Sequence, residues 1–195
     1  FSPKLTIYIL ITATITYATG MILEKVANSR QKAMDDLKSS PNKDNRKEEK
    51  AAVKSRYQTR LRIFFYAGVL IILGILLYLK YYNFFAENVN LIAGASEDSP
   101  VLPIKTIALP LGISFYTMQA ISYMADIYWG KLEAQRNPLK LLLYLCFFPT
   151  IIEGPIALYR DMKDRLYVGN SIDPDNVIRG YTRFIWGVMK KLVIA

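Results

Sequence analysis

The chain has 195 residues, no histidine and a single cysteine, Cys146. Histidine is the commonest general base near neutral pH and a frequent metal ligand, so its absence excludes the simplest catalytic pairs and many metal sites. One cysteine can form neither an intramolecular disulfide nor a thiolate cluster, and Cys146 lies in the apolar run LLLYLCFF, which is typical of a small core residue. We therefore expect no metal ion and no bound cofactor.

Long uncharged runs are present instead. Hydrophobic residues make up 52% of the chain and are clustered rather than spread. The first run, residues 5–23, has 19 residues without charge and fits one transmembrane helix. It is too long for the apolar part of a signal peptide, and no cleavage site follows it. A second transmembrane helix is predicted over residues 63–85, where it ends in an aromatic cluster, YYNFF, of the kind found at membrane interfaces.

Residues 24–62 separate these two spans and are strongly basic. They hold 12 Lys/Arg and six Asp/Glu residues, which gives +6 of the net charge of +9. The positive-inside rule places such a segment in the cytoplasm, where anionic lipid headgroups would attract it. Its stretch SSPNKDNRKEEK has no apolar periodicity, so we predict a loop that is mobile in the middle. Because both flanks are membrane spans and no aromatic residue is interleaved before Tyr57, we expect no nucleic-acid partner.

Proline and glycine residues are predicted to interrupt the helices in the next part of the chain. An acidic outer loop is predicted over residues 86–103 and a third span over residues 104–129. Pro110 and Gly112 near the start of that span indicate a kink or a discontinuous helix. The start of a further helix is predicted over residues 175–195. With no strand pattern and no internal repeat, the sequence predicts an all-α, multi-pass protein of the cell membrane.

The apolar segment within residues 139–159 is shorter than a span. It has only 12 uncharged residues before Glu153, Gly154 and Pro155. A run of this length favours a re-entrant segment, and a full crossing that buries Glu153 is the alternative. Glu153 would then either pair with a cation such as Arg160 or have a functional role.

The third span carries a polar stripe in the sequence LGISFYTMQAISYMADIYWGK. At 100° per residue, four of its polar side chains fall within about 80° of one another on a helix, and a fifth lies at the margin. These are Tyr116, Gln119, Tyr123 and Asp126, with Ser122 at the margin. Lipid offers such groups no partner, so the stripe faces either neighbouring helices or a water-filled passage. We expect Asp126 to lie at the cytoplasmic mouth, within reach of water or of Lys131.

Four segments follow one another in a characteristic order. They are KYYNFFAENVN, LPLGISFYTMQAISYMADIYWGK, NPLKLLLYLCFFPTIIEGPIALYRD and GYTRFIWGVMKKLVIA. In this order and spacing, over about residues 63–195, they resemble the membrane-bound O-acyltransferase family. The similarity is greatest to its bacterial branch, which acylates alginate, peptidoglycan and teichoic acids. The basic segment 24–62 is longer than in that family, and Glu153 occupies a position where the family pattern varies, so no family role is carried onto it.

The resemblance implies a multi-helix bundle around a central tunnel, in which an acyl donor and an acceptor meet from opposite sides of the membrane. The polar stripe and Glu153 become candidates for the tunnel wall. The full-length protein would transfer an acyl group, such as acetyl, to a hydroxyl of a cell-surface polymer. Its donor would be a thioester, either acetyl-CoA or an acyl carrier protein. The family's general base is a histidine downstream of KKLVIA, so the chain is interpreted as an amino-terminal half that is inactive alone and contains no catalytic residue.

The resemblance also implies partners. These are membrane lipid, the carboxy-terminal half of the same protein, and either an outer-face accessory acyltransferase or a cytoplasmic acyl carrier. Two other interpretations stay open. Breaks at Pro110/Gly112 and at Gly154/Pro155 are typical of transporter binding sites, so the chain could be a transporter fragment. It could also be a non-catalytic membrane scaffold whose basic segment recruits a partner.

Overall fold

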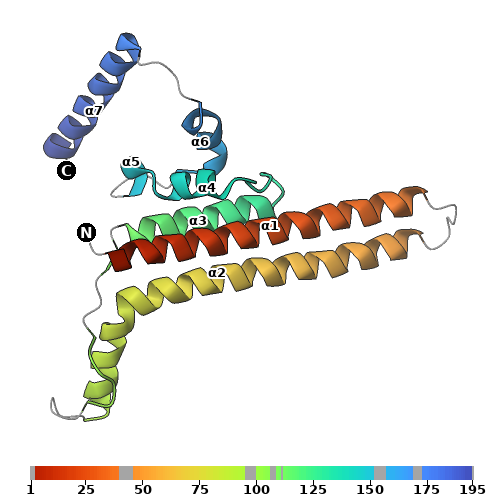
Figure 1. The fold of residues 1–195 in the computed structure, drawn as a ribbon, viewed down its shortest axis with the longest axis horizontal. Helices are drawn as coiled ribbons and strands as arrows, with labels where there is room; N and C mark the ends of the chain where they lie inside the picture. Colours follow the sequence, from red (N-terminus) through yellow and green to blue (C-terminus); the bar gives the residue numbers. More distant parts are fainter. Residues whose placement is uncertain are drawn as a thin grey trace. The chain divides into compact units, whose positions relative to one another are not determined.

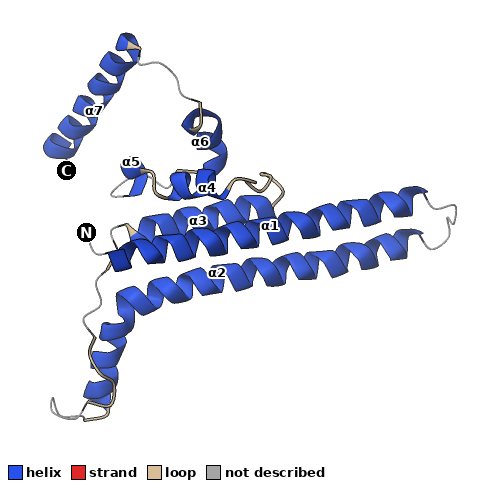
Figure 2. Cartoon of the chain, in the orientation of Figure 1, coloured by secondary structure: helices blue, strands red, loops and turns tan. Residues whose placement is uncertain are grey.

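The computed structural model describes residues 3–39, 46–94, 100–105, 109–110, 112–151, 157–168 and 173–194. Within these ranges every regular element is a helix, which confirms the predicted all-α class for them (Figures 1 and 2). The helices are α1 (Pro3–Ser39), α2 (Arg46–Ile92), α3 (Ile113–Tyr128), α4 (Pro138–Leu145), α5 (Phe148–Ile151), α6 (Tyr159–Leu166) and α7 (Pro174–Ile194). The chain divides into two compact units, Phe1–Met162 and Lys163–Ala195.

The helices α1 and α2 lie side by side as an antiparallel pair (Figure 1). Both are long and apolar enough to cross a membrane, over Thr6–Lys38 and Glu48–Ile92. The only proline in α1 is Pro3, and α2 contains no proline. Pro3 lies in the first turn, where a backbone N–H would have no hydrogen-bond partner within the helix, so its missing N–H costs nothing. Their most apolar windows are only 28% and 17% buried, whereas the core helix of a soluble protein is mostly buried. This exposure fits a membrane protein.

The basic segment is helical where the structure describes it, so its expected lack of regular structure is wrong for these residues, while its cytoplasmic position stays a prediction. The helices α1 and α2 continue into it from both sides, and α2 includes RKEEK from the stretch predicted to be mobile; residues 40–45 of that stretch lie outside the described residues. The segment is rich in Lys, Arg, Glu, Gln and Ala, which are good helix formers, so its charge was mistaken for a lack of structure. Arg30 Nη1 also donates a hydrogen bond to Gln58 Oε1 across the pair (3.4 Å).

Small residues let α3 approach both long helices closely. A Cβ atom at Gly68 of α2 would lie 2.7 Å from Thr19 Cγ2 of α1 and 3.3 Å from Met124 Sδ of α3. A Cβ atom at Gly20 of α1 would lie 3.2 Å from Tyr123 Cε1. Glycine at helix contacts is the usual way in which membrane helices gain close backbone packing.

The helix α3 is shorter than the span predicted over residues 104–129, which is therefore wrong in its bounds. It has 16 residues, a rise of about 24 Å, whereas a span needs roughly 20 residues. Gly112 precedes it in the left-handed region, with φ 74°. A Cβ atom there would collide with the carbonyl oxygen of Ile151, so this position requires glycine. The predicted discontinuity near Pro110 and Gly112 thus falls at the start of α3.

The predicted outer loop, residues 86–103, begins as helix because α2 runs on to Ile92. Two asparagines of α2, seven residues apart, then hold the returning chain along the helix. Asn90 exchanges two hydrogen bonds with the backbone of Leu102, both 2.9 Å. Asn83 exchanges two with the backbone of Lys105, of 2.6 and 3.1 Å.

The apolar segment within residues 139–159 is not one helix. It forms the short helices α4 and α5, which are separated at Cys146 and Phe147, so a single crossing helix is wrong for this segment. Asn137 caps α4 by accepting a hydrogen bond from Leu139 N (2.9 Å). Whether the segment re-enters the membrane stays a prediction. Three residues named by the sequence analysis, Glu153, Gly154 and Pro155, lie outside the described residues.

Candidate functional site on the polar side of α3

The predicted polar stripe of α3 is buried. The exposed fraction is 1% for Tyr116, Gln119 and Tyr123 and 4% for Asp126, while Ser122 is half-buried. Most of these side chains contact parts of the first unit that follow α3 in sequence: the loop after it, α5 and the start of α6. The other side of α3 is buried too, at Ile113, Thr117 and Met124, so the helical periodicity identified the polar residues that share a side but not which side is withdrawn from the surface.

Gln135, in the loop after α3, links α3 to α6. Its backbone N–H donates to Tyr123 Oη (2.8 Å), and its Nε2 donates to Tyr159 Oη (2.7 Å). The Tyr159 ring meets the rings of Tyr123 and Tyr144 edge-on, with centroids 5.1 and 5.0 Å apart. The hydroxyl of Tyr144 donates to the carbonyl of Ala157 (2.6 Å). Tyr123 is thus an interhelical contact, as one interpretation of the stripe expects.

Three residues of this network, Gln135, Tyr144 and Tyr159, were missed by the sequence analysis. The bonds of Gln135 span 12 and 24 residues of sequence. Helical periodicity relates residues within one helix, so it carries no signal for such contacts. The one available hint was the polar character of Gln135 beside a helix end.

Two buried carboxylates in this unit form ion pairs with arginines. Asp126 Oδ1 lies 3.8 Å from Arg160 Nη1, and Glu24 Oε2 lies 3.0 Å from Arg136 Nη2. The two acidic side chains are only 6% and 10% exposed. Lys131, the cation expected beside Asp126, packs over a tryptophan ring instead. Lys131 lies beyond the end of α3, after Gly130 in the left-handed region (φ 70°), and only its backbone N–H bonds to Asp126, at the carbonyl oxygen (2.9 Å).

Three buried polar atoms on this side of α3 have no hydrogen-bond partner among the described residues. They are Tyr116 Oη, Gln119 Oε1 and Asp126 Oδ2. The other end of the Gln119 amide does have one, because Nε2 donates to Thr150 Oγ1 of α5 (3.0 Å). An unpartnered buried polar atom costs roughly 1–3 kcal/mol, so each is expected to bond to water, to a ligand or to another part of the protein.

The chemistry of these three atoms suits partners that donate O–H or N–H hydrogen bonds. Gln119 Oε1 and an ionised Asp126 Oδ2 only accept hydrogen bonds, and the phenol of Tyr116 can donate or accept. Residues 116 and 126 are separated by about 15 Å along a helix. The row could therefore receive hydrogen-bond donors at successive points along the helix.

Several bacterial enzymes are similar to this chain. It is 35% identical over 145 residues to the "Probable alginate O-acetylase AlgI" of Pseudomonas aeruginosa, which covers 74% of the chain and 27% of that protein. It is 37% identical over 128 residues to the protein of the same name from Azotobacter vinelandii, which covers 66% of the chain and 25% of the relative. It is 29% identical over 160 residues to the "Peptidoglycan O-acetyltransferase" of Helicobacter pylori, which covers 69% of the chain and 29% of that protein.

The chain spans about a quarter of the length of these relatives. No family model matches it. No solved structure matches it either. The similarities nevertheless confirm the resemblance, carried by the sequence motifs, to the bacterial O-acetylases of the membrane-bound O-acyltransferase family.

Proposed function

We propose that the chain forms part of a membrane enzyme that transfers an acyl group, such as acetyl, to hydroxyls of a cell-surface polymer. The observation that carries this proposal is the similarity to proteins named alginate O-acetylase and peptidoglycan O-acetyltransferase. The two long apolar helices support a membrane location. The transporter and scaffold interpretations receive no support from these relatives.

In this proposal the acceptor hydroxyl attacks the carbonyl carbon of an acyl thioester. The thiolate leaves, and a general base takes the hydroxyl proton. The donor is acetyl-CoA or an acyl carrier protein, reached from the cytoplasm beside the basic segment 24–62. Because the chain has no histidine, the base is assigned to another part of the protein. An accessory acyltransferase on the outer face is proposed as a partner of the full-length enzyme.

The role of this chain is to line the path of the acceptor. The unpartnered oxygens of Gln119 and Asp126 support this role because they can accept hydrogen bonds from successive polymer hydroxyls. Tyr123 contributes to the same wall by packing, since its hydroxyl is already bonded to Gln135. Glu153 is kept as a candidate for the path on sequence grounds alone.

The experiment is genetic and chemical. Deleting the gene should remove base-labile acetyl esters from one envelope polymer, and a full-length copy should restore them. Residues 1–195 alone should not restore them, because they lack the base. Unchanged ester content in alginate-like, peptidoglycan and teichoic acid fractions would overturn the proposal. Restoration by residues 1–195 would move the base into this chain, with Glu153 as the first candidate.

A further inference from the structure

The helix α7 has two chemically distinct sides. At 100° per residue, six apolar or aromatic side chains fall within about 100° of one another. They are Val177, Tyr181, Phe184, Ile185, Val188 and Leu192, and all six are exposed within the described residues. Diametrically opposite lies a basic side, formed by Arg179, Arg183 and Lys190.

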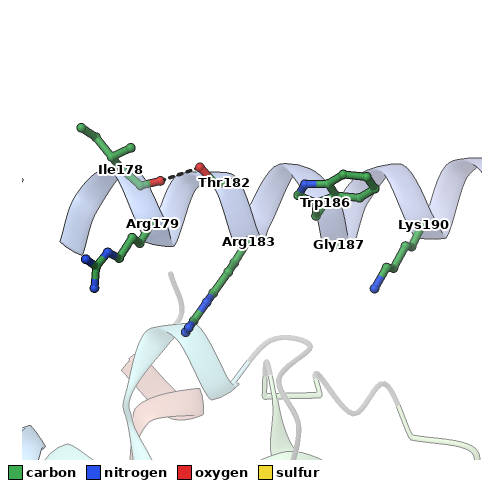
Figure 3. Close-up of a pocket in the computed structure, with 7 residues that line it drawn as sticks. All are labelled: Ile178, Arg179, Thr182, Arg183, Trp186, Gly187 and Lys190. Carbon is green, nitrogen blue, oxygen red and sulfur yellow. Dashed lines mark hydrogen bonds between the residues drawn. The ribbon is translucent and has the colours of Figure 1, made fainter. Parts of the chain in front are cut away.

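The basic side has one acidic neighbour, Asp175, in the first turn of α7 and four residues before Arg179. Beyond Asp175, α7 contains four Lys/Arg residues and no Asp or Glu. Figure 3 shows Arg179, Arg183 and Lys190 projecting to the same side of the helix, with Trp186 next to them. Thr182, a polar uncharged residue on its margin, bonds back to the Ile178 carbonyl (2.9 Å), so its hydroxyl is already satisfied. Within the described part of the chain, none of the three cations forms an ion pair.

This composition does not suit a helix that crosses the membrane. With 21 residues, α7 would be long enough, at about 31 Å. However, α1 and α2 are the described helices apolar enough to span, and α7 is not one of them. Cations spread from Arg179 to Lys190 would place charge along half of a crossing helix, where it is costly.

The same composition suits a helix that lies in the plane of the interface. Such helices bury an apolar side in the acyl boundary and keep Lys and Arg among the headgroups. Trp186 lies beside the basic side, about 20° from Arg179 around the helix, where an amphipathic ring is favoured at the level of the headgroups. A row of cations with no acidic partner is complementary in charge to anionic headgroups.

We propose that α7 is an interfacial helix whose basic side, Arg179, Arg183 and Lys190, binds the headgroups of anionic phospholipids. Each cation near such a surface strengthens docking by roughly a factor of five. The three together are therefore worth roughly a hundredfold in the docking equilibrium.

The test uses the depth of Trp186. Residues 1–195 contain two tryptophans, so Trp129 and any tryptophan outside these residues are changed to Phe to leave Trp186 as the single emitter. The protein is reconstituted in nanodiscs of phosphatidylcholine with or without phosphatidylglycerol, with bromine near the top of the acyl chains as quencher. Quenching of Trp186 should be strong with phosphatidylglycerol, weak without it, and reduced by high salt.

Two triple variants distinguish the effect of removing positive charge from α7 from the effect of removing the same charge elsewhere in the protein. Changing Arg179, Arg183 and Lys190 to Gln should reduce quenching in phosphatidylglycerol discs to the phosphatidylcholine level. Helix content by circular dichroism should not change, because Gln is nearly as good a helix former as Lys and Arg. Changing Lys50, Lys54 and Arg56 of α2 to Gln removes the same charge elsewhere and should leave quenching unchanged. Three results would overturn the proposal: no quenching of Trp186 in either lipid, equal quenching in both, or quenching that the α7 substitutions do not change. The first of these results would indicate that protein covers this helix.

Discussion

The helices α3 and α7 both have one polar and one apolar side, but they place the polar side in opposite environments. In α3 the polar side is buried within the first unit, where Gln119 and Tyr123 are 1% exposed. In α7 the polar side carries exposed cations with no ion-pair partner in the described part of the chain. The same helical periodicity therefore predicts that a helix has two sides, without predicting which side is withdrawn.

The kind of polar group accounts for the difference. The stripe of α3 is made of tyrosine, glutamine and one aspartate, whose hydrogen bonds can be met inside a protein by a few well-placed partners. The side of α7 is made of arginine and lysine, which are very costly to bury without a counter-charge. Substitutions at matching positions of the two helices can test this account.

The largest contrast is expected between two glycines. Gly112→Ala forces a residue with a Cβ atom into the left-handed region and against the Ile151 carbonyl, so it should lower the free energy of unfolding by about 2–3 kcal/mol. Gly180→Ala in α7 meets nothing within 4 Å and should instead favour the helix by about 0.5–1 kcal/mol. Denaturant unfolding in detergent, followed by circular dichroism, measures both. Equal effects would contradict the close contact at the start of α3.

Gly112 also shows what the sequence could and could not predict. Proline and glycine near it predicted an interruption in the third span, and periodicity predicted which residues of α3 share a side. The collision partner, Ile151, is 39 residues away, and such a contact depends on how later elements pack. For the same reason Arg160 could not be chosen over Lys131 as the partner of Asp126. The extent of α1 and α2 was missed because charge was weighed above helix propensity.

The second largest effect concerns turnover rather than folding. In the full-length enzyme, Asp126→Asn should lower acyl transfer about tenfold, because it removes a buried anionic acceptor from the proposed path. Stability should change little, since Asn retains an oxygen toward Arg160 and the arginine side chain is 39% exposed. Asp161→Asn is the matched control, because its carboxylate contacts the same arginine from an exposed position. Normal turnover in Asp126→Asn would remove this residue from the path.

A smaller effect on stability is expected from tyrosine hydroxyls. Tyr123→Phe leaves the half-buried Gln135 N–H without its acceptor, which should cost about 1 kcal/mol of unfolding free energy. Tyr181→Phe in α7 removes a hydroxyl from a residue that is 67% exposed and should change stability by less than about 0.5 kcal/mol. Thermal unfolding of both variants under one condition gives the comparison. If Tyr181→Phe were the more damaging change, the exposed character assigned to α7 would be wrong.

The smallest effect, and the most specific, is expected at Gln119. Its Nε2 donates to Thr150, while its Oε1 is buried without a partner in the described part of the chain. Gln119→Leu removes one hydrogen bond and one unsatisfied oxygen together, so the two contributions to stability nearly cancel. The melting temperature should therefore stay close to that of the unchanged protein.

Turnover separates the two roles that Gln119 can have. If Oε1 accepts a hydrogen bond from a passing polymer hydroxyl, Gln119→Leu in the full-length enzyme should lower turnover about threefold, because one weak contact to the acceptor is lost. Thr150→Val is the matched control, since it removes the partner of Nε2 and leaves Oε1 in place. A stable Gln119→Leu enzyme with full activity would restrict Gln119 to helix packing. A destabilised variant would show that the bond to Thr150 outweighs the unpartnered oxygen.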